Sequence, residues 1–77
     1  MSFAFEFYYR SPANEERETL TIKEVVDGGG QLDYREPESE TGGVICLTFA
    51  FENRANAETV AVALRMRGEH VEAVFDY

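Results

Sequence analysis

The chain has 77 residues, 44% of them hydrophobic, and its 15 acidic and 7 basic side chains give a formal net charge of -8. A chain of this length forms one small domain, here residues 1–77, and its apolar content excludes wholesale disorder. The acidic excess argues against nucleic acids and anionic membrane surfaces as partners, because both are negatively charged.

Cysteine and histidine, which are common in catalytic and metal sites, are scarce in the sequence. Cys46 is the only cysteine and His70 the only histidine, and no nucleotide-binding, metal-binding or catalytic motif occurs. We expect these two side chains on nonadjacent strands, too far apart to act as a pair. The sequence therefore predicts no metal site and no cofactor, and it favours a protein without enzymatic activity.

No membrane or targeting signal is recognisable. No stretch approaches the roughly 20 apolar residues of a membrane span. The first ten residues, MSFAFEFYYR, lack the basic region and the cleavage site of a signal peptide. These observations predict a cytoplasmic protein.

The first predicted element is a half-buried strand over residues 2–10. Every second side chain is aromatic, which gathers on one face Phe3, Phe5, Phe7 and Tyr9. A helix is expected next, because Ser11 suits its N-cap, Pro12 its first turn, and the glycines at 28–30 its end. Residues 19–26 also fit a strand, since TLTIK is β-branched and alternates, but the cap and stop signals favour the helix.

A β-hairpin is predicted in the middle of the chain. Its first strand covers residues 31–36, with Leu32 and Tyr34 facing inward and Asp33 and Arg35 outward. The polar segment EPESETGG forms the loop. In the second strand, over residues 44–52, the alternation directs inward Ile45, Leu47, Phe49 and Phe51, and outward Cys46, Thr48 and Ala50.

The last third of the chain predicts a helix over residues 54–67 and a strand over residues 70–77. The helix has an apolar stripe at helical spacing made of Ala57, Val60, Ala61 and Leu64. Asn53 or Asn56 suits its N-cap, and Gly68 its end. Alternation in the final strand places on one face Val71, Ala73, Phe75 and Tyr77.

The order of these elements, βαββαβ, predicts an α+β fold of ferredoxin-like topology. A four-stranded antiparallel sheet would carry both helices on one face, with the first and third strands in its centre. Those two strands contain the two copies of the sequence FAFE, at residues 3–6 and 49–52. We therefore interpret the repeated phenylalanines as core residues.

The segment LTFAFENRANAETVAVAL, residues 47–64, resembles the third strand and second helix of RNA-recognition motifs. Members of that family stack bases on aromatic side chains of the outer sheet face. In this sequence the expected outer positions hold Cys46, Thr48 and Ala50, and Tyr8 is the one outer aromatic of the central strands. The resemblance therefore implies the topology, and RNA binding is not expected.

The leading functional hypothesis is an interaction or regulatory module that forms a homodimer. A flat outer sheet face or an apolar patch on the second helix would be its interface, formed by Tyr8, Cys46, Thr48, Ala50, Val62 and Met66.

Two alternatives remain open. The loop RSPAN, residues 10–14, suggests a small-molecule sensor that resembles ACT-type regulatory domains. The resemblance implies an amino-acid-like ligand near that loop, bound by Arg10, Ser11 and Asn14. The net charge of -8 also fits an acidic inhibitor or mimic that binds a basic protein surface.

Overall fold

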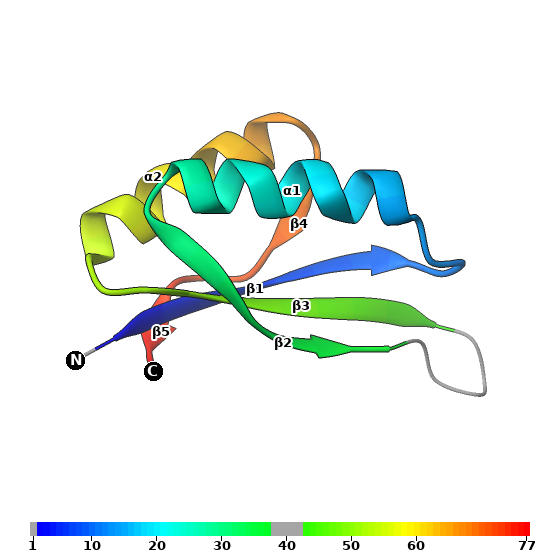
Figure 1. Cartoon of the computed structure of the whole chain (residues 1–77), viewed down its shortest axis with the longest axis horizontal. Coiled ribbons are helices and arrows are strands. Elements are labelled where there is room, and N and C mark those ends of the chain that lie inside the picture. Colours follow the sequence, from blue (N-terminus) through cyan, green and yellow to red (C-terminus); the bar gives the residue numbers. More distant parts are fainter. Residues whose placement is uncertain (1, 38–42) are drawn as a thin grey trace.

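The computed structural model describes residues 2–37 and 43–77 and is shown in Figure 1. Along the chain the elements are β1 (Phe3–Arg10), α1 (Glu15–Asp27), β2 (Gly30–Glu36), β3 (Val44–Phe51), α2 (Arg54–Met66), β4 (His70–Val71) and β5 (Phe75–Asp76). The polar hairpin loop expected after Glu36 falls mostly outside the described residues.

The elements form two layers, an antiparallel sheet and a pair of helices on one side of it (Figure 1). This arrangement agrees with the predicted α+β class. The strands follow the order β2-β3-β1-β4, and β5 also pairs with β1. Within the described residues the sheet therefore has five strands instead of the predicted four. No helix in the described residues is long and apolar enough to span a membrane.

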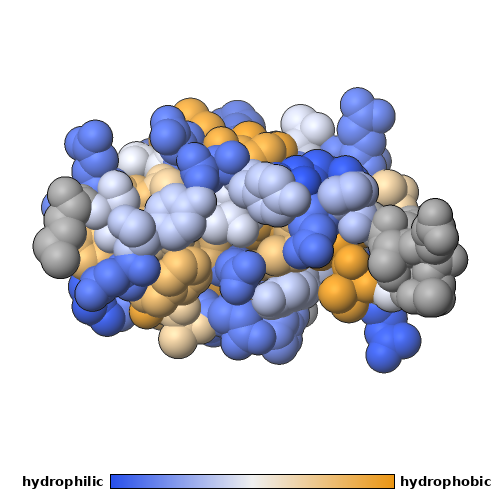
Figure 2. All heavy atoms as spheres, turned by 90° about the horizontal axis from the view of Figure 1, so that it is seen from below, coloured by the Kyte–Doolittle hydropathy of each residue, from blue (hydrophilic) through white to orange (hydrophobic). Residues whose placement is uncertain are grey.

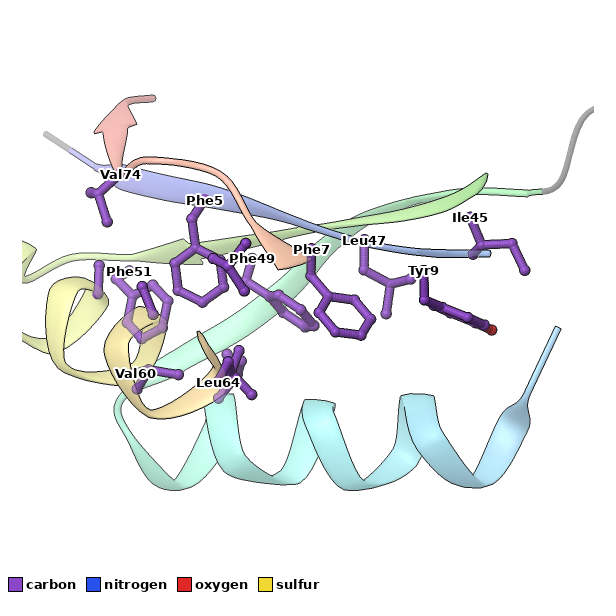
Figure 3. Packing of buried hydrophobic residues seen from close by; sticks show 14 residues of the cluster. Phe5, Phe7, Tyr9, Ile45, Leu47, Phe49, Phe51, Val60, Leu64 and Val74 are labelled. Atoms are coloured by element: carbon purple, nitrogen blue, oxygen red, sulfur yellow. The ribbon is translucent and has the colours of Figure 1, made fainter. Parts of the chain in front are cut away.

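The core depends on the pairing of β1 with β3. The two FAFE copies run antiparallel to each other, with Phe3 opposite Phe51 and Phe5 opposite Phe49. Their rings pack closely, since the Phe5 centroid lies 5.8 Å from that of Phe49 and 5.5 Å from that of Phe51. Figure 3 shows these side chains filling the space between the sheet and the helices. The interpretation of the repeat as core is confirmed for Phe5, Phe49 and Phe51, and Phe3 packs at the edge.

Helix α1 covers the ambiguous segment 19–26, so the helical prediction is confirmed there. Its N-cap was predicted wrongly. Asn14 caps the helix by accepting a hydrogen bond from the Arg17 amide at 3.0 Å, whereas Ser11 lies in the preceding loop, before a cis peptide bond to Pro12. Asn is as good an N-cap residue as Ser.

Helix α2 agrees closely with its prediction. Asn53 caps it, and the four residues of the predicted stripe are all buried. At its C-terminus the Glu69 amide donates to the Leu64 carbonyl and the Gly68 amide to that of Arg65. This is a Schellman motif, and it requires a left-handed residue, which Gly68 supplies with a φ of +89°.

Strand β2 contains an irregularity that the sequence did not predict. Its register against β3 shifts between Leu32 and Tyr34, so that Tyr34 lies opposite Thr48 and Arg35 opposite Leu47. The extra residue reverses the faces beyond it. Tyr34, predicted inward, therefore lies on the open side of the sheet, and Arg35, predicted outward, turns toward α1.

The final strand is also interrupted. Residues 72–74 separate β4 from β5, and the pairing partners on β1 shift by one residue across this break. Val74 is buried in the core in place of the predicted Ala73. Phe75 lies opposite Ala4, on the open side of the sheet, so its predicted inward orientation and that of Tyr77 are wrong.

The shifted register of β2 creates a buried polar cluster between the sheet and α1. Glu18 is only 8% exposed, and Arg35 donates to both of its carboxylate oxygens, at 2.7 and 3.0 Å. The Tyr9 hydroxyl donates to the same carboxylate and accepts from the Asn14 amide. The hydrogen bonds from Arg35, joined by that of Tyr9 and opposed by burial, hold the pKa of Glu18 below its usual range.

We predict that this cluster makes stability depend on pH in the acidic range. A lowered folded-state pKa stabilises the protein fully above the unfolded pKa of about 4.3, and the contribution is lost as pH falls through the folded value. Glu18→Gln should cost about 1–3 kcal/mol of unfolding free energy near neutral pH, because it weakens buried charged hydrogen bonds. Urea unfolding of both proteins measures this difference, which should shrink at acidic pH.

Glu58→Gln is the matched control, because Glu58 is an exposed residue of α2. It should change the unfolding free energy by less than about 0.5 kcal/mol. Equal stabilities of the Glu18→Gln variant and the native protein near neutral pH would contradict the account.

Candidate functional site

The open face of the sheet, opposite the helices, carries more aromatic side chains than expected. Three are well exposed: Tyr34 at 58%, Phe75 at 38% and Tyr77 at 53%. Tyr8 adds a fourth, half-buried ring near the middle of β1. Tyr34 and Phe75 owe their position to the two register shifts, and the Phe75 ring packs edge-on against Tyr77 with centroids 5.9 Å apart.

Small residues of the central strands lie beneath these rings. Pairing places Ala4 opposite Phe75, Cys46 opposite Tyr8, and Thr48 opposite Tyr34. The exposed fractions of these small residues are 0%, 4% and 7% in the same order. Pairing of large with small side chains across strands fills the surface. The accessible part of the face is therefore formed mainly by its aromatic and charged residues.

A polar cluster lies in the middle of this face. The Tyr8 hydroxyl donates to one carboxylate oxygen of Glu6 at 3.3 Å, and the Cys46 thiol to the other at 3.5 Å. Burial, together with Cys46 and Glu6, raises the pKa of Tyr8 to about 12. Burial and the Glu6 carboxylate raise the pKa of Cys46 to about 11. Tyr8 also separates Cys46 from His70 in the pairing, as expected from the strand order.

We predict that Cys46 is a structural thiol that reacts slowly. Its raised pKa alone lowers the thiolate fraction near pH 8 by roughly 100-fold, and only the thiolate is the nucleophile. Alkylation by iodoacetamide, followed by mass spectrometry, should be at least about 100-fold slower in the folded protein than in urea. A folded-state rate equal to that of the unfolded chain would contradict this assignment.

Carboxylates dominate the charged residues of the open face. Glu6, Glu36 and Glu72 point to this side, and Glu52 borders it. Arg10 is the only Arg or Lys among the described residues of the face. The Tyr77 hydroxyl donates a hydrogen bond to Asp33, and this bond links the residue after β5 to strand β2. The same hydrogen bond raises the pKa of Tyr77. Figure 2 shows that the open face is a mixture of hydrophilic and hydrophobic side chains.

A cleft of about 470 Å³ adjoins the face at the end of β1. It is lined by Tyr8, Tyr9, Arg10, Arg17, Val44, Gly68, His70 and Glu72. Arg17 is held by a bidentate contact with Glu69 and lies over the Tyr9 ring, 5.0 Å from its centroid. The hydrogen bonds that Arg17 donates to Glu69 raise the pKa of Arg17.

The structure separates the three residues predicted to bind a small ligand. Arg10 lines the cleft, whereas Asn14 is occupied as the cap of α1. Ser11 is joined to Gly43, since its amide donates to the Gly43 carbonyl at 2.8 Å. Arg10 is thus the one predicted ligand residue that lines the cleft.

The predicted interface residues occupy two different surfaces. Tyr8, Cys46, Thr48 and Ala50 belong to the open sheet face, where Cys46 and Thr48 are nearly inaccessible. Val62 and Met66 are 50% and 83% exposed on α2, in the opposite layer. Sequence reasoning missed Tyr34, Phe75 and Tyr77 because each depends on a register shift. The small residues at the outward positions of β3 are the sequence feature that could have predicted large side chains from neighbouring strands on this face.

Comparison with known proteins adds information about the fold alone. No family model matches the chain, and no curated protein matches it. A solved structure described as "De novo designed protein Foldit4" is similar, with a TM-score of 0.58 and 15% sequence identity over 100% of this chain and 99% of that chain.

Proposed function

We propose that the protein is a non-enzymatic interaction module whose open sheet face binds a basic segment of a partner protein. The observation that carries this proposal is the combination of exposed aromatic rings with carboxylates on one face. Tyr34, Phe75 and Tyr77 supply the rings, and Glu36, Glu52 and Glu72 supply charge around them. A basic segment is proposed because its charge complements the carboxylates of the face, and charge complementarity governs partner choice and association rate.

Arginine and lysine side chains match both parts of this surface. A guanidinium group pairs with carboxylates and also stacks on aromatic rings, an interaction of about 0.5–1 kcal/mol at exposed sites. Two of the exposed rings are held in place by neighbours, since Tyr77 donates a hydrogen bond to Asp33 and packs on Phe75. Ordered rings lose little conformational entropy when a partner binds.

The charge of the face also weighs against the other occupants. RNA could stack on four aromatic rings, but the same carboxylates would repel its phosphates. A second copy of the chain, which the sequence suggested, would bring two sets of carboxylates together. We therefore favour a basic partner over the homodimer, and the acidic inhibitor is the special case in which that partner is an enzyme.

We also propose that the topology is the ferredoxin-like βαββαβ arrangement. The strand order β2-β3-β1-β4 supports it, as does the pairing of β5 with the same strand, β1. On this interpretation β4 and β5 are two halves of one final strand, interrupted at residues 72–74.

The proposal is tested with two triple variants of equal net charge. One removes carboxylates from the sheet face (Glu36→Gln, Glu52→Gln, Glu72→Gln), and its control removes them from the helices (Glu15→Gln, Glu16→Gln, Glu58→Gln). The probe is a fluorescein-labelled peptide of alternating arginine and serine, measured by anisotropy at low salt. The sheet variant should bind about tenfold more weakly and the control less than about twofold, because close charge pairs contribute most.

Several outcomes would contradict the proposal. Equal losses in the two triple variants would mean that only overall charge attracts the peptide. Unchanged binding by Tyr34→Ala would remove the aromatic part of the argument. A dimer in sedimentation equilibrium that Ala50→Arg dissociates would assign the face to a second copy. A dimer that only Met66→Glu dissociates would use α2 and leave the sheet face free for the partner.

A further inference from the structure

We infer that the cleft at the end of β1 binds a carboxylic acid with an apolar or aromatic group, whose carboxylate pairs with Arg10. This site is separate from the proposed partner surface in its chemistry, because it requires a cation where the rest of the open face presents carboxylates.

Arg10 differs from every other basic side chain of the protein. Four Arg and Lys side chains form ion pairs with Glu or Asp, namely Arg17, Lys23, Arg35 and Arg67. Arg65 donates to the backbone carbonyls of Val71 and Glu72, and Arg54 lies over the Phe3 ring. Within the described residues, Arg10 has no such partner. Arg10 is exposed and no described residue pairs with its guanidinium, so in a chain with a net charge of -8 it can pair with an external anion.

The backbone of Arg10 also faces the cleft. Ser2 and Glu6 accept hydrogen bonds from Tyr77 and Glu72, so the peptide groups of even-numbered residues in β1 point toward β4 and β5. The register that joins Tyr8 to His70 would place Gly68 opposite Arg10. However, the Gly68 amide donates to Arg65 in the Schellman motif that ends α2. This turn takes Gly68 out of the strand pairing, and no backbone carbonyl of the described residues accepts from the main-chain N–H of Arg10. That N–H and the Arg10 guanidinium can hold one carboxylate together.

The residues that line the cleft favour an apolar or aromatic group next to the carboxylate of the ligand. The Tyr8 ring packs edge-on against His70, with centroids 5.6 Å apart, and Val44, which is 51% exposed, lies opposite Arg10 on β3. These groups form an apolar surface next to the cation. The volume of about 470 Å³ lies within the range of small-molecule sites.

The carboxylates around the cleft limit the charge of the ligand. Glu72 lines the cleft and contacts His70 at 3.3 Å, and Glu69 neutralises Arg17. Among the described residues that line the cleft, Arg10 is thus the one Arg or Lys without a carboxylate partner. A single negative charge can be accommodated, whereas a phosphate dianion would be repelled by Glu72. A free organic acid and the C-terminus of a peptide share this chemistry.

The test uses benzoate and its uncharged analogue benzamide, followed by the backbone amide shifts of Arg10 and Gly68 in ¹⁵N-correlated NMR spectra. Benzoate should shift both amides, and benzamide should leave them in place. Arg10→Gln should weaken benzoate binding by about tenfold or more, as expected for a charged hydrogen bond. Arg54→Gln, the matched control at an exposed arginine outside the cleft, should change it by less than about twofold.

A second arm distinguishes the two sources of the carboxylate. A tripeptide ending in phenylalanine is compared as the free acid and as the C-terminal amide. Tighter binding of the free acid than of benzoate supports recognition of a peptide C-terminus, and the reverse supports a small organic acid. The inference is overturned if benzoate and benzamide act alike, or if Arg10→Gln binds benzoate as the native protein does. These outcomes do not affect the arginine-peptide test, which depends on Glu36, Glu52 and Glu72.

Discussion

The eight-residue pairing of β1 with β3 is the constraint on which the rest of this structure depends. It aligns the two FAFE copies so that their phenylalanines form one continuous apolar surface, which both helices then cover. Burying these rings is the largest favourable contribution to folding available to so short a chain. The phenylalanines of the two central strands face the helices, and the alternating positions on the open side include the small residues Ala4, Cys46, Thr48 and Ala50.

The open face follows from that arrangement. Ala4, Cys46 and Thr48 would leave a shallow surface in the middle of the sheet, and each is instead covered by an aromatic neighbour. Two of these neighbours, Tyr34 and Phe75, reach the open side through an extra residue in an outer strand. The irregular outer strands thus supply the large side chains that cover the small residues of the central strands. They also concentrate exposed aromatic rings on a face rich in carboxylates.

The predictability of each element follows the strength of its local signal. The core positions of β1, β3 and α2 could be predicted from hydrophobic periodicity because many residues agree on one pattern. The faces of Tyr34, Phe75 and Tyr77 could not, because one extra residue inverts all that follow it. Whether Ala73 or Val74 enters the core depends on packing against α2 and β1, which no local pattern records. Arg10 was predicted as a ligand residue from its sequence neighbourhood. That its main-chain N–H has no acceptor among the described residues depends on the turn between α2 and β4, which no local pattern predicts.

The most direct measurement of the central claim is the set of nuclear Overhauser contacts made by the aromatic side chains of the outer strands. We predict contacts between the Phe75 ring and the Ala4 methyl group, and between the Tyr34 ring and the Thr48 methyl group. Contacts of Phe75 or Tyr34 with core residues such as Leu64 or Phe49 would show that the strands run without these register shifts. That result would contradict the account of the open face and the function proposed from it.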